Sequence, residues 1–199
     1  MTTNPMIFVH IPRTAGSSIG SLTKQLNIVV KGHNIHNKKH IFYYETKECK
    51  SKIYPSFSVI RNPWERAVSS FFYLNNGGLN KYDLRDKQRY IQKYNGDFKA
   101  FIKNEFVSNK VYEQLHFIPQ YKWITDLNGN IVIGSILKYE SLNNDFNDFL
   151  QKNNRRPVTI PIINGSKHVH YPQYYDKETI EIIRNVYQQD IILFDYEFD

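Results

Sequence analysis

The chain has 199 residues, of which 41% are hydrophobic and 15% aromatic, so it can bury a sizeable core and wholesale disorder is excluded. This length suits one compact domain over residues 1–199. The 26 Lys and Arg residues outnumber the 19 Asp and Glu residues, and the resulting formal charge of +7 favours an anionic ligand or partner.

The N-terminal sequence and the cysteine content predict a cytoplasmic protein. No apolar stretch approaches the roughly 18 residues that a membrane-spanning helix needs. The apolar run at 6–10 lacks the basic flank and the length of an export signal. Cys49 is the only cysteine, so no internal disulfide can form and no oxidising compartment is required. We therefore expect no membrane partner.

The first part of the chain predicts a strand, a loop and a helix in that order. The nearly continuous apolar run 6–10 is typical of a strand buried on both faces of a parallel sheet. Residues 17–26 have helical spacing, with Ser17 or Ser18 as the capping residue. A second strand is predicted at 28–30.

The same order of elements recurs farther along. Residues 57–60 predict a strand, and Pro63 is well placed in the first turn of a helix that continues to Phe72. Two polar segments, 75–87 and 153–157, are predicted as surface insertions. Further strand-like segments are 131–133 and 135–138, and further segments with helical spacing are 98–106, 145–150 and 177–187.

Alternating strands and helices indicate an α/β fold, with a mainly parallel sheet and right-handed crossover connections. Ligands of such sheets bind at the carboxyl ends of the strands. The loops that follow Val9 and Ile60 are therefore the candidate ligand-binding loops.

The loop at 10–18 has the composition of an anion-binding turn. Its small residues lead into a helix N-terminus, where backbone N–H groups and the helix dipole favour a phosphate or a sulfate. It is not the nucleoside-triphosphatase motif, because Ser17 rather than Lys follows Gly16. The alternative is that the serines only cap the helix and the arginine is a surface charge. The charged and hydroxyl side chains of the loop are those of Arg13, Thr14, Ser17 and Ser18.

The second loop, 61–69, offers an arginine and a hydroxyl. Arg61 leaves the end of a predicted strand, and Ser69 lies two turns into the helix that follows. If the two side chains converge, they can bind one terminal phosphate together. The alternative is that Glu65 pairs locally with Arg61 or Arg66 and that Ser69 is a surface residue.

Taken together, the two loops resemble the cofactor motifs of the family-2 sulfotransferases, the group that contains the carbohydrate sulfotransferases. The matching segments are 7–19, 58–71, 116–120, 137–142, 164–171 and 174–198. The resemblance implies a P-loop-like three-layer fold, with a central sheet flanked by helices. It also implies transfer of a sulfuryl group from 3'-phosphoadenosine 5'-phosphosulfate (PAPS) to a hydroxyl acceptor, for which we favour a carbohydrate.

The resemblance assigns roles to individual residues. Arg61 and Ser69 correspond to the ligands of the 3'-phosphate, and Lys167 lies in a late loop that folds over the donor. His116 and Gln120 are predicted either to line the acceptor cleft or to pack under the sheet. The residues that correspond to the 5'-phosphosulfate cradle are Pro12, Arg13, Thr14, Ala15, Gly16, Ser17 and Ser18.

Arg13 departs from the family pattern, in which most members carry a lysine. Arginine can still hold the sulfuryl and bridging oxygens. It cannot donate a proton at neutral pH, because its pKa lies above about 12. Arg13 is therefore predicted to act as an electrostatic clamp.

An alcohol acceptor also needs a base, and a histidine with a pKa of about 6.5 suits that role. We favour His40, which precedes a helix-forming stretch as the base does in the resembled sequences. His33 is the alternative, because some carbohydrate members place the base after a glycine. The alternative for each of these two residues is a solvated histidine in a loop, without a catalytic role.

The spacing of His33, His36 and His40, with Cys49 nearby, is compatible with a metal site. The segment has no pair of thiols and no convincing carboxylates, and the resembled chemistry uses no metal, so none is predicted.

A second function remains open: a non-catalytic basic module that binds nucleic acid or an anionic glycan. The paired loops of Arg13 and Arg61 favour the sulfotransferase, for which no nucleic acid partner is expected.

Overall fold

The computed structural model describes residues 4–31, 54–126, 128–163 and 169–199. The chain divides into two compact units, each made of two segments. The first unit comprises Met1–Arg61 and Gln120–Gly165, and the second comprises Asn62–Pro119 and Ser166–Asp199. The prediction of one domain over the whole chain stays a prediction.

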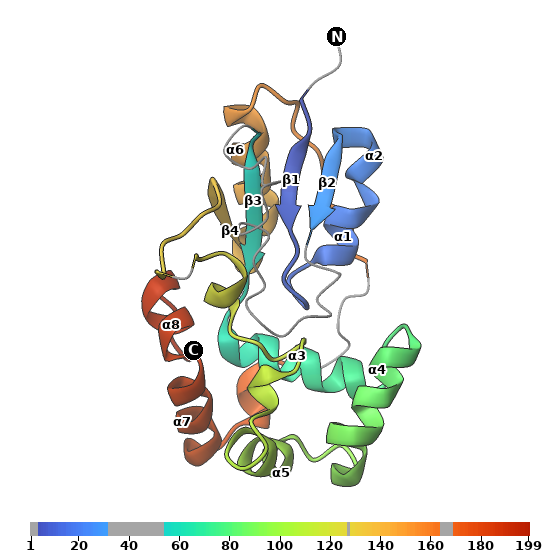
Figure 1. Cartoon of the computed structure of the whole chain (residues 1–199), viewed down its shortest axis with the longest axis vertical. Coiled ribbons are helices and arrows are strands. Elements are labelled where there is room, and N and C mark those ends of the chain that lie inside the picture. The colour runs from blue at the N-terminus through green and yellow to red at the C-terminus, as the bar shows by residue number, and fades with distance from the viewer. Residues whose placement is uncertain (1–3, 32–53, 127, 164–168) are drawn as a thin grey trace. The chain divides into compact units, whose positions relative to one another are not determined.

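The first unit is built on a four-stranded parallel sheet with strand order β2-β1-β3-β4 (Figure 1). Every residue of the central strands β1 and β3 is buried, as expected of strands covered on both faces. The predicted α/β fold is confirmed. The strands are β1 (Met6–Val9), β2 (Ile28–Lys31), β3 (Ser56–Ile60) and β4 (Ser135–Lys138).

The predicted strand at 131–133 is wrong. Ile131 forms only an isolated antiparallel bridge with Thr125. The parallel pairing with β3 instead begins at Ser135, which lies opposite Phe57. Gly134 approaches β3 closely, and its N–H donates to the hydroxyl of Ser56 at 2.9 Å.

The helices of the first unit share one core with the sheet. Phe8 and Phe57 stack on neighbouring strands, with ring centroids 5.0 Å apart. Leu26 and Leu150 are buried in the same cluster. The helical elements of this unit are α1 (Gly16–Ser21), α2 (Thr23–Leu26), α6 (Leu142–Lys152) and the 3-10 turns η6 (Gln120–Trp123) and η7 (Tyr139–Ser141).

The predicted helix at 17–26 is interrupted at Leu22, where α1 ends and α2 begins. Hydroxyl groups explain the break. Ser21 donates to the carbonyl of Ser18, and Thr23 donates to the carbonyl of Gly20. Such local bonds compete with the regular helical ladder.

The second unit begins with α3 (Pro63–Asn75), as predicted from Pro63. The side chain of Asn62 caps this helix by accepting from the N–H groups of Trp64 and Glu65. The predicted surface insertion 75–87 contains a helix, α4 (Lys81–Asp86), which starts after the capping side chain of Asn80. A π-helical segment η2 (Lys87–Ile91) and a 3-10 turn η3 (Gln92–Tyr94) continue it.

The rest of the second unit packs around an aromatic core. Phe71 contacts Phe101, with ring centroids 5.0 Å apart, and Phe101 contacts Phe117 at 5.3 Å. Within the described residues, no helix has the length and apolar character to cross a membrane. The remaining elements are α5 (Phe98–Phe101), η4 (Ile102–Phe106), η5 (Val111–Glu113), η8 (Tyr171–Tyr174), α7 (Lys177–Val186) and α8 (Gln188–Phe194).

The start of α7 yields a prediction for stability. Asp176 accepts from the backbone N–H of Thr179, and this bond, with those from the Thr179 hydroxyl and Lys103, lowers the pKa of Asp176 to about 2. We expect Asp176→Ala to lower the free energy of unfolding at pH 7 by about 1 kcal/mol, and Asp176→Asn to lose much less, because Asn also caps helices well. Urea denaturation measures both.

The pH dependence of this contribution to stability follows from the direction in which the pKa of Asp176 is shifted. A carboxyl group with a lowered pKa in the folded state stabilises the protein above its unfolded pKa of about 3.9. That contribution is lost as the pH falls through the pKa that the carboxyl group has in the folded state. The difference between wild type and Asp176→Asn should therefore be constant from pH 7 to pH 5 and should shrink below about pH 4. A constant difference down to pH 3 would contradict the assigned pKa.

Candidate functional site

The loop between β1 and α1 contains two residues in the left-handed region. Arg13 has φ 69° and Ala15 has φ 67°. The cap of α1 is Ala15, and no side chain caps the helix, so the prediction of Ser17 or Ser18 as the cap is wrong. The left-handed turns start the helix at Gly16, and both serines lie inside it. Left-handed conformations at non-glycine residues store strain and concentrate at functional sites.

Gly16 lies directly against a side chain. A Cβ atom at this position would overlap the imidazole ring of His10. His10 directly follows β1, and its ring also contacts that of Phe8, with centroids 5.6 Å apart. The imidazole therefore forms a wall of the loop at the N-terminus of α1. Sequence reasoning did not single out His10, and only the missing side chain at Gly16 signals the contact.

The three hydroxyl groups of the loop have different surroundings. Thr14 is buried, and its hydroxyl donates to the carbonyl of Ile11 at 2.8 Å. Ser18 accepts from the backbone N–H of Ile163 at 3.2 Å, which leaves its own proton available for another acceptor. Ser17 is exposed. The Thr14 hydroxyl thus stabilises the loop from within.

Arg61 lies at the carboxyl end of β3 and connects the two candidate loops. Only 4% of it is exposed. Its Nη1 atom donates to the carbonyl of Arg13 at 3.2 Å, and its guanidinium lies 4.1 Å from the ring centroid of Tyr139. Both arginines therefore belong to one edge of the sheet, where an anion can bind.

Gln120 holds the main chain of Arg61. Its Oε1 accepts from the Arg61 N–H at 2.9 Å, and its Nε2 donates to the Arg61 carbonyl at 2.8 Å. The side chain of Gln120 is buried. This geometry favours the packing role that the sequence left open. A direct contact of Gln120 with an acceptor stays a prediction.

Tyr139 was missed by the sequence reasoning, although a signal for it exists. Ile60 and Lys138 are paired in the parallel register of β3 and β4. The residues that follow these two strands, Arg61 and Tyr139, are therefore neighbours at the same edge of the sheet. Stacking on the ring restricts the guanidinium to one plane.

The second candidate loop continues into the second unit. Ser69 lies on α3, where its side chain is buried. The convergence of Ser69 with Arg61 stays a prediction. On the same helix, Arg66 and Ser70 both donate to the carbonyl of His116, at 3.2 and 2.9 Å.

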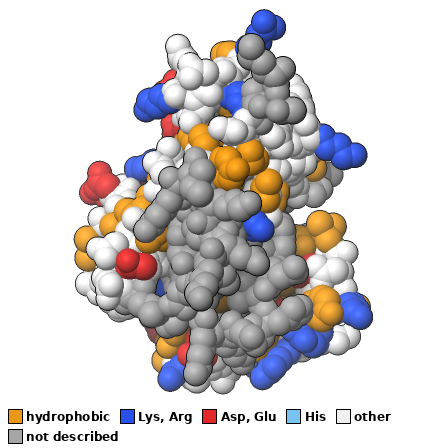
Figure 2. All heavy atoms as spheres, turned by 45° about the horizontal axis from the view of Figure 1, so that its top comes forward, with side chains coloured by type: hydrophobic (Ala, Val, Ile, Leu, Met, Phe, Trp, Pro, Cys, Tyr) orange, Lys and Arg blue, Asp and Glu red, His pale blue; other side chains and the backbone are white. Residues whose placement is uncertain are grey.

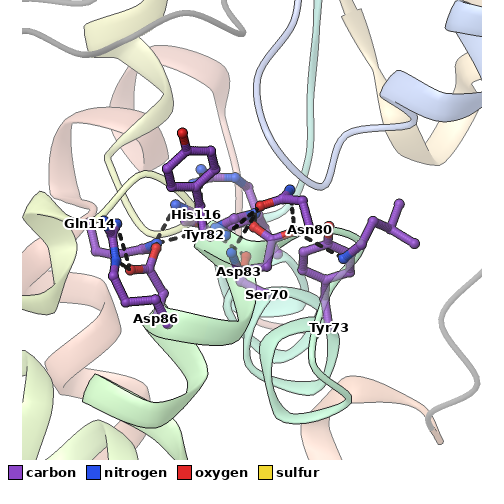
Figure 3. A network of polar contacts seen from close by, with 11 residues as sticks. Ser70, Tyr73, Asn80, Tyr82, Asp83, Asp86, Gln114 and His116 are labelled. Atoms are coloured by element: carbon purple, nitrogen blue, oxygen red, sulfur yellow. Dashed lines mark hydrogen bonds and ion pairs between the residues drawn. The ribbon is translucent and has the colours of Figure 1, made fainter.

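His116 is buried within the network of Figure 3. Gln114 accepts from the His116 N–H and donates to Asp86, which fixes the orientation of its amide. The Gln114 Nε2 atom therefore faces His116 Nδ1 as a donor, at 3.3 Å, while His116 Nε2 lies 3.7 Å from Asp83. Both ring nitrogens face protein groups, so the geometry favours packing; acceptor binding by His116 stays a prediction.

Several predicted residues lie outside the described residues. These include both candidate bases, His40 and His33, and the late-loop Lys167. The histidine and cysteine spacing considered for a metal, His33, His36, His40 and Cys49, also lies there. Across 4–31, 54–126, 128–163 and 169–199, no group of three or more His, Cys, Asp or Glu residues could hold a metal ion.

Comparison with known proteins assigns the family. Residues 2–197 match the model of the sulfotransferase family, in its family-2 form. Because the match spans nearly the whole chain, this protein belongs to the sulfotransferase family, and the resemblance is confirmed. The family defines an enzyme that transfers a sulfuryl group to an acceptor. Neither a curated protein nor a solved structure matches the chain.

The contact between His10 and Gly16 leads to a testable prediction. We expect Gly16→Ala to lower the free energy of unfolding by about 1–3 kcal/mol, because the added methyl group displaces the imidazole. In a His10→Ala background the same substitution should cost at least about 1 kcal/mol less. Chemical denaturation of the wild type, the two single variants and the double variant completes this double-mutant cycle.

Gly20→Ala is the matched control. It lies in the same helix, and a Cβ atom there would meet nothing within 4 Å. This substitution should be neutral or stabilise by up to about 1 kcal/mol, because alanine has the higher helix propensity. Equal losses at Gly16 in both backgrounds would refute the proposed contact.

Proposed function

We propose that this sulfotransferase uses PAPS as its donor and transfers the sulfuryl group to a hydroxyl of a carbohydrate. One observation carries the proposal. The Arg61 side chain is bonded to the main chain of Arg13, so the two motifs that resemble the 3'-phosphate and 5'-phosphosulfate sites share one edge of a parallel sheet. Ligands of α/β proteins bind at this edge.

The first loop supplies the proposed cradle for the 5'-phosphosulfate. Backbone N–H groups at the N-terminus of α1 and the positive charge of Arg13 attract its oxygens. The hydroxyls of Ser17 and Ser18 add donors, while Thr14 keeps the loop in shape. The left-handed backbone of Arg13 and Ala15 holds the turn open for a bound anion.

Arg61 supplies the proposed site for the 3'-phosphate. A planar guanidinium suits bidentate contact with phosphate oxygens. Gln120 holds its main chain and Tyr139 holds its side chain, so little ordering entropy remains to be lost when the nucleotide binds. The family motif adds Ser69 and Lys167 as further proposed ligands.

The proposed reaction is an in-line displacement. The acceptor oxygen forms a bond to sulfur while the bond from sulfur to the 5'-phosphate oxygen breaks, and 3'-phosphoadenosine 5'-phosphate leaves. The acceptor proton passes to the proposed base, His40 or, as the alternative, His33. Arg13 and the loop amides stabilise the charge that develops, each by about 3 kcal/mol by analogy with other oxyanion sites. Arg13 remains protonated throughout.

The first experiment measures nucleotide binding by calorimetric titration. We expect 3'-phosphoadenosine 5'-phosphate to bind more tightly than ADP and ATP, because these lack the 3'-phosphate. Arg61→Ala should weaken its binding about 10- to 100-fold, the effect of removing a hydrogen bond to a charged group. Arg156→Ala, which removes the same charge from an exposed position in the first unit, should leave binding unchanged.

The two arginine variants separate specific recognition from net charge. Equal binding of all three nucleotides by the wild type would contradict a PAPS donor. Equal weakening by Arg61→Ala and Arg156→Ala would indicate nonspecific attraction to a basic surface.

The second experiment identifies the base. With radiolabelled PAPS and a panel of saccharide acceptors, we expect His40→Ala to lower kcat by about 10²- to 10⁴-fold, and His33→Ala to lower it much less. Since the base must be neutral, the wild-type rate should rise with pH through about 6.5, and the variant that lacks the base should lose that dependence. The affinity for 3'-phosphoadenosine 5'-phosphate should not change. Retention of full activity by both variants would refute a histidine base.

A further inference from the structure

The main chain of Arg61 lies just beyond the end of the sheet. The pairing of β3 with β1 extends to Ser58, and its pairing with β4 extends to Ile60. Arg61 follows both ladders and precedes the helix α3. Buried N–H and C=O groups need hydrogen-bond partners, because water cannot reach them. At Arg61 the structure supplies these partners from a side chain.

The amide of Gln120 bonds both main-chain groups of Arg61. Its Oε1 atom accepts from the Arg61 N–H at 2.9 Å, and its Nε2 atom donates to the Arg61 carbonyl at 2.8 Å. An amide that bonds both groups of one residue copies the exchange of hydrogen bonds between paired strands. Gln120 is fully buried, so neither bond competes with water. We call these two hydrogen bonds the amide clasp.

The amide clasp joins two points that are far apart in the sequence. The chain leaves the first unit after Arg61 and returns to it at Gln120. Both residues belong to the first unit, so the clasp holds the exit and the return of the chain together within that unit. At such an exit the strand ladder no longer defines the direction of the main chain. The clasp therefore supplies that definition for Arg61.

The direction of the Arg61 side chain depends on this main chain. The guanidinium lies about 6 Å from Cα, so a rotation of about 10° at Cα moves it by about 1 Å, enough to spoil a well-oriented contact. The far end of the side chain is held by the carbonyl of Arg13 at 3.2 Å and by the ring of Tyr139 at 4.1 Å. The amide clasp holds the near end.

Arg61 differs from the cations at the surface of this protein. Figure 2 shows Lys and Arg side chains that stand out from the surface, where each can turn toward an anion as it arrives. Only 4% of Arg61 is exposed. A buried guanidinium cannot search for its ligand, so its position must be set before the ligand binds. What Arg61 can bind therefore depends on how its main chain is held.

We propose that Gln120 is a positioning residue that determines the selectivity of this protein for a nucleotide with a 3'-phosphate. It acts through Arg61 and does not touch the nucleotide. The amide clasp aims the guanidinium so that it makes charge-assisted hydrogen bonds to the 3'-phosphate, and a nucleotide without that phosphate gains nothing from the clasp. The selectivity rests on the proposed function, in which Arg61 binds the 3'-phosphate; the clasp itself rests on the geometry of the first unit.

Two other roles for Gln120 lead to different results. If the side chain only filled space in the core, its loss would lower stability and weaken the binding of all nucleotides alike. If it contacted the acceptor, which the sequence left open, its loss would leave nucleotide binding unchanged. The positioning role predicts a loss that is specific for the 3'-phosphate.

The test removes the amide clasp with little change in volume. Gln120→Met removes both hydrogen bonds and keeps the length of the side chain. Gln120→Asn is a milder second variant, whose amide is one methylene group too short to reach both main-chain groups. The matched control is Asn147→Leu in the same unit, because the Asn147 side chain also bonds the main chain, accepting from the Val158 N–H at 2.8 Å. Calorimetric titration measures binding, and circular dichroism establishes that each variant folds.

We expect Gln120→Met to weaken the binding of 3'-phosphoadenosine 5'-phosphate about 10-fold, because the guanidinium is misplaced but still present, and to change the affinity for ADP less than about twofold. Gln120→Asn should weaken the 3'-phosphorylated nucleotide by at least about threefold, again without an effect on ADP. Asn147→Leu should leave the ratio of the two affinities unchanged. Equal weakening of both nucleotides in the Gln120 variants, or an unchanged affinity for both, would overturn the proposal.

A measurement without nucleotide separates this proposal from the proposed function. Phenylglyoxal modifies accessible arginines, and mass spectrometry gives the rate at Arg61. We expect this rate to be low in the wild type and in Asn147→Leu, and at least about threefold higher in Gln120→Met, because the released main chain lets the guanidinium leave its buried position. A higher rate in Gln120→Met, with a wild type that does not prefer 3'-phosphoadenosine 5'-phosphate to ADP, would refute the 3'-phosphate site but not the positioning of Arg61. A wild type with that preference, and Gln120 variants that keep it in full, would refute the role of Gln120 alone.

Discussion

The first unit depends on how it accommodates the buried guanidinium of Arg61. Burial of an arginine is costly unless its charge is compensated and its donors are bonded. The carbonyl of Arg13 and the ring of Tyr139 supply part of that compensation, and Gln120 fixes the main chain. These contacts come from three different segments of the chain. The position of one side chain therefore determines how the loop after β1 is held against the loop after β3.

In the second unit the buried charges are negative, and they too are compensated by hydrogen-bonding groups inside the protein. Its buried carboxylates, Asp83 and Asp86, are held by hydroxyl, amide and backbone donors rather than by exposed cations alone. Because the negative charges are satisfied inside, the positive ones remain at the surface. A helical segment with mixed charges along its sequence thus presents a single sign to solvent.

Much of this protein can be predicted from local sequence. The apolar run at Met6–Val9 predicts a buried strand, and Pro63 after Asn62 predicts the start of α3; both are confirmed. Two loops at strand ends and their family resemblance predict a sulfotransferase, and the family match confirms it. These features depend on residues close together in the chain, where propensities and capping act directly.

Other features depend on residues far apart, and the sequence alone did not reveal them. The pairing of Ile60 with Lys138 brings Tyr139 to Arg61, and the path of the first loop brings His10 onto Gly16. The break at Leu22 and the left-handed cap at Ala15 are local, but helical spacing does not reveal them either, because hydroxyl bonds and the turn conformation override it. The sequence by itself therefore determined the strands that pair in the sheet, the motifs and the family, but it also predicted a strand at 131–133 that the structure lacks. Only the tertiary structure determined which side chains meet, because strand register and loop path result from packing across the whole sheet.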